Sequence, residues 1–251
     1  MGQRLVALAT ADESLTLAGA LEWSGHPKFG QDAGAIAGVG EIGLPLSDSL
    51  PDGVQAVIDF SVPAGAAAIV PICRQRGVPL VMATTGLDDA TQQAIHAAAK
   101  EIPLLWAPSM STAVNLVMKL TEIAGGVLKD VAGGADAEVI ERHHRYKEDA
   151  PSGTALRFGQ IIADSMGISS HVHGREGRPG ARPHDEIGYH ALRVGDNPGE
   201  HTIVFGLLGE TIELTVRATN RDCYALGALA AAKWLAGKPA GLYGMNDVLG
   251  L

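Results

Sequence analysis

Side chains able to bind an anion and to transfer a proton are concentrated in residues 141–156, which read ERHHRYKEDAPSGTAL. The first part of this segment has the pattern of a strand. If the strand continues past His144, then His143, Arg145 and Lys147 lie on one face, because side chains alternate along a strand. Proton-bearing and cationic groups on one face suit an anionic substrate that must also receive a proton.

The end of the same segment predicts a binding site for a carboxylate. Pro151 ends the extended run, and Ser152, Gly153 and Thr154 open a helix. The first N–H groups of a helix have no intrahelical partner and lie at the positive end of its dipole, so they bind anions. The alternative is a solvated basic strand end followed by an ordinary helix cap at Ser152. We favour the binding site, because the basic cluster directly precedes it in an acidic chain.

A metal site is not expected. His143 and His144 point to opposite faces if they lie in a strand, and neither cysteine stands at the spacing of metal ligands. The chain has 2 cysteines, Cys73 and Cys223, which exclude a disulfide framework and are typical of a reducing compartment. Neither has a neighbouring base in the sequence, so we interpret both as packing residues and not as nucleophiles.

The composition limits the partners of the protein. The 251 residues carry a formal net charge of −9, with 46% apolar and 19% charged residues, which is a globular composition. The negative charge disfavours nucleic acid and anionic membranes as partners, because repulsion opposes encounter with either. No apolar run reaches spanning length, and the N-terminus lacks the pattern of a secretory signal. We expect a cytoplasmic protein.

The order of apolar runs in residues 1–110 predicts an α/β domain with a parallel sheet. The expected strands are residues 18–23, 56–61, 79–85 and 103–107, with helices at residues 65–76 and 90–100. In such a sheet ligands bind beyond the carboxyl ends of the strands. The residues at two of these ends are small or polar: Ala83, Thr84 and Thr85 after one strand, and Ala107, Pro108, Ser109 and Met110 after the next.

A change of pattern after residue 113 predicts a second domain, inserted into the first. A long amphipathic helix at residues 113–128 leads out of the first sheet. The other expected elements are strands at residues 137–144, 187–194, 201–207 and 211–219, a helix at residues 153–166, and a Gly/Pro/Arg-rich loop at residues 171–185. A last helix at residues 224–235 returns to the first domain and is followed by an irregular tail. The expected domains are residues 1–113 with 221–251, and residues 114–220.

The run at residues 141–156 closely resembles the signature of the 4-hydroxy-tetrahydrodipicolinate reductase family, also called dihydrodipicolinate reductase. The resemblance continues in order through shorter motifs: Asp59-Phe60-Ser61, Thr84-Thr85-Gly86, Ala107-Pro108-Ser109-Met110-Ser111, Val114-Asn115, Gly199-Glu200-His201-Thr202 and Asp247-Val248-Leu249. It implies a Rossmann-like dinucleotide-binding domain plus an α+β domain for substrate, whose sheet in the family builds a homotetramer. It also implies nicotinamide-dependent reduction of the dehydrated dicarboxylate substrate to tetrahydrodipicolinate, in lysine and diaminopimelate synthesis.

The resemblance also implies roles for individual residues. His143 matches the family's proton donor and acceptor, and Lys147 matches its second proton donor. His144 matches a position that contacts the substrate. The other matching positions are Gly153 and Thr154 at the backbone site for a substrate carboxylate, Ala83, Thr84 and Thr85 at the first cofactor contact, and Ala107, Pro108, Ser109 and Met110 at the second.

The start of the chain departs from the family pattern. The family begins with a strand and a glycine-rich loop for the cofactor pyrophosphate, and the start of this sequence, with Gly2, aligns with the last two residues of that loop. We expect the first strand and most of the loop to be missing here, and favour an internal methionine of a longer protein as the reason. Two other functions compete with that of the reductase. One is a non-catalytic truncated homologue, which binds the dicarboxylate but little cofactor. The other is an oxidoreductase for another small dicarboxylate or aldehyde.

The choice of cofactor is expected to depend on residues after the next strand. Glu22 fits the acidic position that hydrogen-bonds a ribose 2′-hydroxyl, which favours NADH. Trp23 follows, where an arginine would favour NADPH. His26 and Lys28 lie close enough to keep NADPH open as the alternative.

Overall fold

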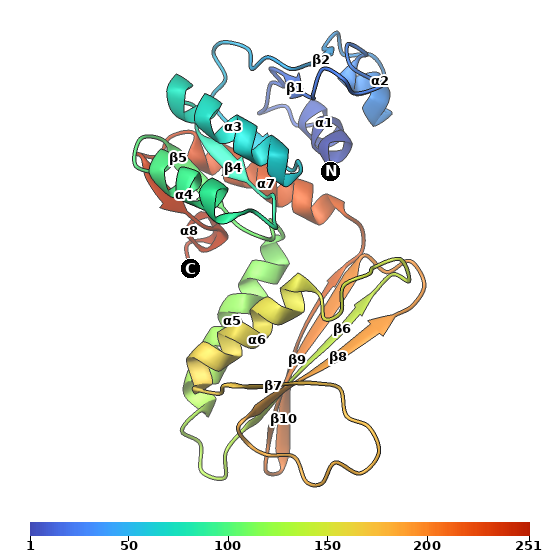
Figure 1. Ribbon diagram of the computed structural model, residues 1–251, viewed down its shortest axis with the longest axis vertical. Coiled ribbons are helices and arrows are strands. Elements are labelled where there is room, and N and C mark those ends of the chain that lie inside the picture. The colour runs from blue at the N-terminus through green and yellow to red at the C-terminus, as the bar shows by residue number, and fades with distance from the viewer. The chain divides into compact units, whose positions relative to one another are not determined.

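The structure, a computed structural model, describes residues 1–251 and divides into two compact units. Unit 1 consists of Met1–Thr112 and Arg221–Leu251, and unit 2 of Ala113–Asn220. The chain therefore leaves unit 1, forms unit 2 and returns, as the colours of Figure 1 show. None of its helices combines the length and the apolar character needed to cross a membrane.

Unit 1 is built on a four-stranded sheet in the order β11-β5-β4-β3, in which all pairs are parallel. Its strands are β3 (Val57–Asp59), β4 (Leu80–Met82), β5 (Pro103–Trp106) and β11 (Gly241–Tyr243). The helices that pack on it are α3 (Pro63–Arg76), α4 (Asp89–Ala98) and α7 (Asp222–Leu235).

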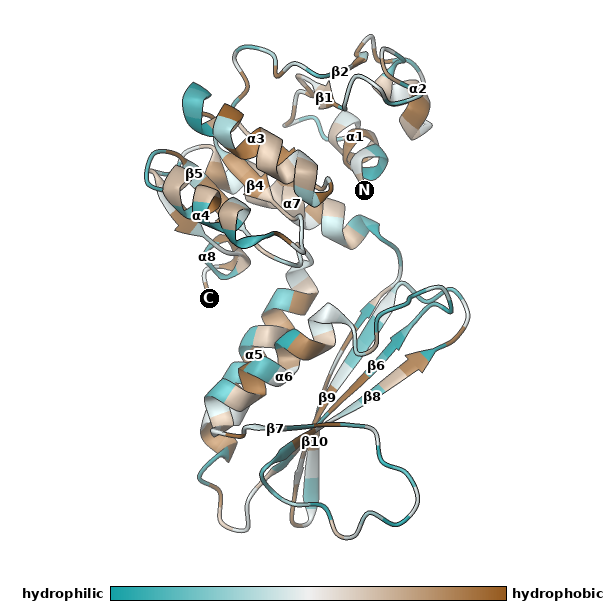
Figure 2. Ribbon diagram, viewed as in Figure 1, coloured by the Kyte–Doolittle hydropathy of each residue, from teal (hydrophilic) through white to brown (hydrophobic).

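Both faces of this sheet are covered, which explains the continuous apolar sequence of β4. Leu80 and Met82 belong to one core with residues of α3 and α4, whereas Val81 belongs to another with residues of α7. The apolar colour of β4 in Figure 2 reflects this burial on both sides. The α/β class predicted from the sequence is confirmed.

The remaining elements of unit 1 are short. They are α1 (Gly2–Thr10), β1 (Ala20–Leu21), α2 (Ala33–Ala37), β2 (Leu46–Ser47) and α8 (Met245–Leu249). β1 and β2 pair in parallel as a sheet of their own, so the strand expected at residues 18–23 shrinks to two residues. The tail expected to be irregular contains β11 and α8. Three residues leave no periodic pattern to recognise, and pairing with β5 makes Gly241–Tyr243 a strand.

Unit 2 is a five-stranded mixed sheet in the order β10-β9-β6-β8-β7, with helices on one face. Its strands are β6 (Asp136–His143), β7 (Ser170–His173), β8 (Glu186–Arg193), β9 (Gly199–Leu207) and β10 (Glu210–Ala218), and its helices are α5 (Thr112–Leu128) and α6 (Gly153–Met166). Alternation along β6 turns Ala137, Val139, Glu141 and His143 toward the helices and buries them. Two apolar core positions of this strand are thus followed by two ionisable ones.

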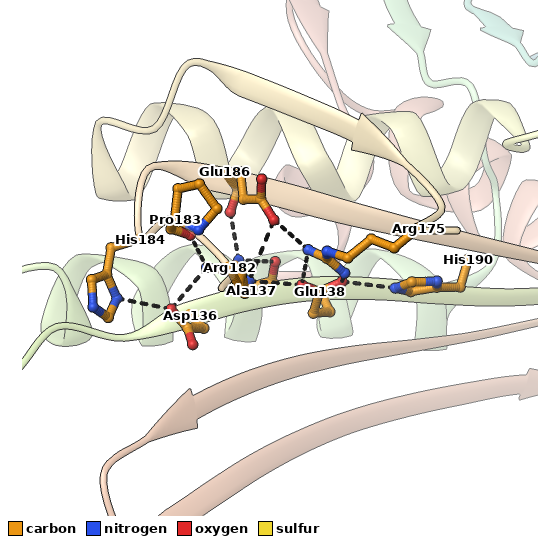
Figure 3. Close-up of polar contacts among 9 residues, drawn as sticks. All are labelled: Asp136, Ala137, Glu138, Arg175, Arg182, Pro183, His184, Glu186 and His190. Carbon is orange, nitrogen blue, oxygen red and sulfur yellow. Dashed lines mark hydrogen bonds and ion pairs between the residues drawn. The ribbon is translucent and has the colours of Figure 1, made fainter. Parts of the chain in front are cut away.

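The segment expected to be a loop at residues 171–185 is partly a strand, and ion pairs connect the rest of it to the sheet. β7 pairs with β8, and the hydrophilic segment after it (Figure 2) carries Arg175 and Arg182. Arg175 Nη2 lies 2.7 Å and Arg182 Nε 2.8 Å from Oε1 of Glu138, on the face of β6 opposite to Glu141. Figure 3 shows both guanidinium groups converging on this carboxylate. Long-range ion pairs therefore order a segment whose composition alone indicates a loop.

Candidate active site

A buried Glu141–His143 pair occupies the end of β6. The two residues lie two positions apart on one strand, so their side chains point to the same face. Oε2 of Glu141 lies 2.5 Å from Nδ1 of His143, and both side chains are buried. A hydrogen bond to an ionised carboxylate is charge-assisted and stronger than one between neutral groups.

Three further hydrogen bonds, from Arg193 and Ser152, hold Glu141 in place. Arg193, at the end of β8, binds it with both guanidinium arms, from Nη1 to Oε2 and from Nη2 to Oε1, each at 2.8 Å. The backbone N–H of Ser152 donates to Oε1 at 3.0 Å. Burial opposes ionisation of Glu141, but hydrogen bonds from His143, Arg193 and Ser152 prevail and lower its pKa to about 2. The carboxylate is therefore ionised at neutral pH.

A second histidine, His201 on β9, packs against the pair. It stands directly opposite Glu141 in the antiparallel β6–β9 ladder. Its ring lies edge-on to that of His143, with 5.2 Å between the centroids, and its Nε2 lies 3.1 Å from Oγ of Ser152. Burial, followed by the charge of His143, lowers the pKa of His201 to about 4. His201 is therefore neutral at neutral pH.

The prediction that His143, Arg145 and Lys147 share the face of one strand is wrong. β6 ends at His143, and the backbone N–H of Arg145 donates to the carbonyl oxygen of Gly195. Residues 145 and 146 form a turn, which leaves Arg145 exposed. Contacts with the loop after β8 replace the sheet ladder here, and an alternating pattern cannot reveal such contacts.

Lys147 nevertheless lies close to the histidines. Its Nζ forms an ion pair with Asp149 Oδ1 at 2.8 Å, and its side chain is only 22% exposed. The positive charge of Lys147 also contributes to lowering the pKa of His201. The turn, and not strand alternation, therefore brings this cation to the site.

His144, the first residue after β6, has one unusual feature. Its backbone N–H donates to the carbonyl oxygen of Asn197, but its ring Nδ1 is buried without a hydrogen-bond partner in the chain. Buried polar atoms in native proteins nearly always have a partner. This nitrogen is therefore a buried polar atom that the chain leaves without a partner.

The predicted helix start is found at the predicted residue, since α6 begins at Gly153. Ser152 caps the helix by accepting a hydrogen bond from the N–H of Ala155, and its backbone N–H is bound to Glu141. Both polar groups of Ser152 are thus engaged within the protein. Gly153 and Thr154 follow in the first turn, where N–H groups point out of the helix end.

The candidate cofactor residues lie in unit 1. A cavity of about 330 Å³ lies at the carboxyl ends of β4 and β5, lined by Thr84, Thr85, Gly86, Leu87, Gln92, Trp106 and Pro108. The hydroxyl of Thr84 is buried and donates to Oδ2 of Asp59 at 2.5 Å. This hydrogen bond connects the end of β4 to the end of β3. Gly86 has a φ of +70°, a backbone conformation that favours glycine and lets the chain turn beside the cavity.

Not all predicted cofactor residues line this cavity. The structure buries Ala83, Ala107, Ser109 and Met110 around the same strand ends. Glu22 follows β1, and its carboxylate accepts a hydrogen bond from the N–H of Trp23, whereas Gly2 is the first residue of α1. Thr84, Thr85 and Pro108 are therefore the predicted residues that the cavity brings together.

Comparison with known families decides what the chain is related to. The N-terminal part of the dihydrodipicolinate reductase family matches residues 1–110, and its C-terminal part matches residues 113–249. The chain belongs to this family.

Named members of the dihydrodipicolinate reductase family are similar over the whole chain. The 4-hydroxy-tetrahydrodipicolinate reductase of Rhodopirellula baltica is 59% identical, over 100% of this chain and 92% of that protein. The enzyme of the same name from Alkalilimnicola ehrlichii is 45% identical, over 100% and 95%. Among solved structures, the dipicolinate-bound dihydrodipicolinate reductase from Paenisporosarcina sp. TG-14 has a TM-score of 0.76 and 24% identity, and covers 98% of this chain and 94% of its own. The last likeness confirms the fold of this family.

In this member of the dihydrodipicolinate reductase family, three residues of the site were not predicted from the sequence: Glu141 of the buried pair, and Arg193 and His201 around it. Glu141 stands two residues before His143, a spacing that the alternation of a strand could have revealed. Arg193 and His201 join the site only through the pairing of β8 and β9 with β6. Nothing in the local sequence around either residue indicates that partnership.

Replacing Gly199 by alanine is expected to lower kcat by about 10-fold or more, because the added methyl group would displace His143, the expected proton donor, and displacement of a reacting group is costly. An added Cβ would lie 3.0 Å from Nε2 and 3.3 Å from Cδ2 of His143, and Gly199 has a φ of +157°. The matched control is Gly206→Ala on the same strand, where the added Cβ meets only Asp136 at 4.0 Å. Steady-state kinetics of both variants tests this prediction, and equal rates would contradict it.

Proposed function

We propose that this protein uses nicotinamide hydride to reduce 4-hydroxy-tetrahydrodipicolinate, through its dehydrated form, to tetrahydrodipicolinate in lysine and diaminopimelate synthesis. The observation that carries the proposal is the buried Glu141–His143 pair beside the start of α6, in a chain 59% identical to a reductase of that name. The pair provides a site for proton exchange, and the helix start provides N–H groups for a carboxylate.

The protein's own residues supply the proton and the substrate contacts. A bound nicotinamide cofactor supplies the hydride. His143 is the proposed proton donor at Nε2, because its Nδ1 is occupied by Glu141. Lys147 is the proposed second proton donor, and as a cation it also attracts the anionic substrate.

The substrate carboxylates are proposed to bind at two places. The N–H groups of Gly153 and Thr154 receive one of them at the start of α6. His144, which directly follows β6, is proposed as a further substrate contact. Ser152 is proposed to organise the site, since its hydroxyl and its N–H already bind His201 and Glu141.

The cofactor is proposed to bind at the carboxyl ends of β4 and β5. The proposed contacts are Ala83, Thr84, Thr85, Ala107, Pro108, Ser109 and Met110, with Gly2 and Glu22 as further contacts. The cavity there has threonine side chains and a glycine turn on its wall, which suit a polar ligand that approaches the backbone closely. Glu22 favours NADH over NADPH, because a carboxylate hydrogen-bonds a ribose hydroxyl and repels a phosphate.

The assembly is proposed to be a homotetramer in the cytoplasm. The face of the unit 2 sheet opposite α5 and α6 carries apolar side chains that no helix of this unit covers, including Ile140 (38% exposed) and Leu192 (39% exposed). Association of such faces would bury this apolar surface. A reducing cytoplasm would keep Cys73 and Cys223 as thiols.

Calorimetric titration of the purified chain with NADH and with NADPH, each with and without pyridine-2,6-dicarboxylate, tests the proposed function. We expect micromolar binding of a cofactor, tighter for NADH, together with binding of the dicarboxylate. A rate assay with 4-hydroxy-tetrahydrodipicolinate then measures oxidation of the reduced cofactor. Binding of the dicarboxylate without either cofactor, and without turnover, would instead support the non-catalytic alternative.

A further inference from the structure

The carboxylate of Glu141 has a complete set of hydrogen-bond donors. Oε1 accepts from Arg193 Nη2 and from the N–H of Ser152, and Oε2 accepts from Arg193 Nη1 and contacts Nδ1 of His143. Two contacts on each oxygen fix the plane of the carboxylate. The side chain of Glu141 is only 1% exposed and has a fixed orientation, so it also fixes the orientation of the His143 ring that it contacts.

The other ring nitrogen of His143 is left without a bond inside the chain. Nε2 faces the backbone of Gly199, where even a methyl group would come within 3.0 Å. His201 lies edge-on to the ring, and its own ring Nε2 contacts the hydroxyl of Ser152. The surroundings of His143 thus bind one nitrogen firmly and keep the second free of side-chain partners.

We infer that Glu141 is the positioning residue of His143: it keeps the proton on Nδ1 and leaves Nε2 as the nitrogen that exchanges a proton with the substrate. This inference deepens the proposed function and rests on it. A carboxylate behind a histidine selects the ring tautomer and its orientation, and stabilises the imidazolium form. Arg193 keeps that carboxylate ionised by balancing its charge.

The proton balance of the step is simple. The substrate gains a hydride from the cofactor and a proton from Nε2 of the His143 imidazolium. The N–H bond at Nε2 breaks, and the ring remains as the neutral tautomer with its proton on Nδ1. Water returns a proton to Nε2 for the next cycle. Glu141 neither gains nor loses a proton at any stage.

The charged and titratable groups around His143 come from every neighbouring element. They are Glu141 on β6, Arg193 on β8, His201 on β9, and Lys147 with Asp149 in the segment after β6. Arg193 is already paired with Glu141 and Lys147 with Asp149, and His201 is neutral. Glu141 is therefore the carboxylate in direct contact with the ring.

The test compares Glu141→Gln with Glu138→Gln. Glu138 lies on the same strand and faces the other side, and it is also bound by two arginines and a histidine, with His190 Nε2 at 2.8 Å from Oε2 (Figure 3). Burial opposes its ionisation, but these hydrogen bonds lower its pKa to about 2, as at Glu141. The control therefore removes the same charge from a similar network that does not contact His143.

We expect Glu141→Gln to lower kcat by about 100-fold or more, because loss of the orienting carboxylate leaves a catalytic histidine in the wrong tautomer. Arg193 would bind the amide oxygen, so the amide NH₂ would face Nδ1 and force the proton to Nε2. KM and the affinity for pyridine-2,6-dicarboxylate should change by less than about 3-fold, since the substrate contacts remain. Glu138→Gln should keep the kcat of the unaltered protein at the same state of assembly.

Nitrogen-15 NMR of histidine-labelled protein adds a measurement that a purely structural role would not affect. We expect the unaltered protein to show His143 with its proton on Nδ1, and Glu141→Gln to show it on Nε2.

Three results would overturn the inference: an unchanged kcat in Glu141→Gln, an equal loss in Glu138→Gln, or an Nε2–H tautomer in the unaltered protein. The last measurement needs no variant, so it holds even if Glu141→Gln fails to fold. An Nδ1–H tautomer in a protein without reductase activity would instead remove the proposed function and leave the positioning geometry intact.

Discussion

Replacement of His143 by glutamine is expected to lower kcat by about 100-fold to 10,000-fold, the usual contribution of general acid–base catalysis. Glutamine can accept or donate a hydrogen bond at a similar place, but it cannot exchange a proton near neutral pH. KM and the dissociation constant of pyridine-2,6-dicarboxylate should therefore change little. Steady-state kinetics with both substrates varied, and calorimetry with the dicarboxylate, measure these quantities.

The matched control for this variant is His190→Gln. His190 also contacts a carboxylate, with Nε2 at 2.8 Å from Glu138 Oε2, but it lies on the opposite face of the sheet. It should keep the kcat of the unaltered protein. If His143→Gln also keeps it, His143 has no part in proton transfer, and the proposed chemistry loses its central group.

Replacement of Lys147 by alanine is expected to impair both turnover and substrate binding. The variant loses a proton donor and a cation, and a hydrogen bond to a charged group contributes about 1.5–3 kcal/mol. We therefore expect KM for the dicarboxylate substrate to rise by about 10-fold or more and kcat to fall by about 100-fold. Rates measured over a range of substrate concentrations separate the two effects.

Two further variants isolate the cause. Lys119→Ala removes a lysine of the same unit that also pairs with a carboxylate, Glu122 at 3.1 Å, and should leave the kinetics unchanged. Asp149→Asn removes the partner of Lys147 and keeps the cation, so it should have a much smaller effect than Lys147→Ala. A rate for Lys147→Ala equal to that of the unaltered protein would exclude both roles.

Comparison of Lys119→Ala with Lys147→Ala also distinguishes a general electrostatic effect from a local one. With a net charge of −9, the protein repels an anionic substrate at long range, so loss of any cation could raise KM slightly. Such an effect should be equal for Lys119→Ala and Lys147→Ala and should vanish at high salt. A difference that persists at high salt would assign the binding effect to the site.

Local sequence was sufficient for the features that depend on neighbours along the chain. The helix at residues 153–166 was predicted with the bounds that α6 has in the structure, because a proline, a capping serine and an amphipathic pattern are all local signals. The same locality placed His143, Lys147 and the helix start within one short segment. The parallel sheet was predictable for a similar reason, since a strand buried on both faces is apolar at every residue.

Tertiary structure decided the features that depend on pairing between distant segments. β6 ends at His143 because the following backbone binds the loop after β8, and only that turn brings Lys147 near the histidines. Arg193 and His201 reach Glu141 through strand register, which sequence periodicity does not encode. Alternation along a strand shows which face a side chain occupies, but the partner across the sheet is chosen by packing and hydrogen bonding of the whole unit. The chemistry-bearing residues were therefore visible in the sequence, whereas the groups that orient them became visible only in the fold.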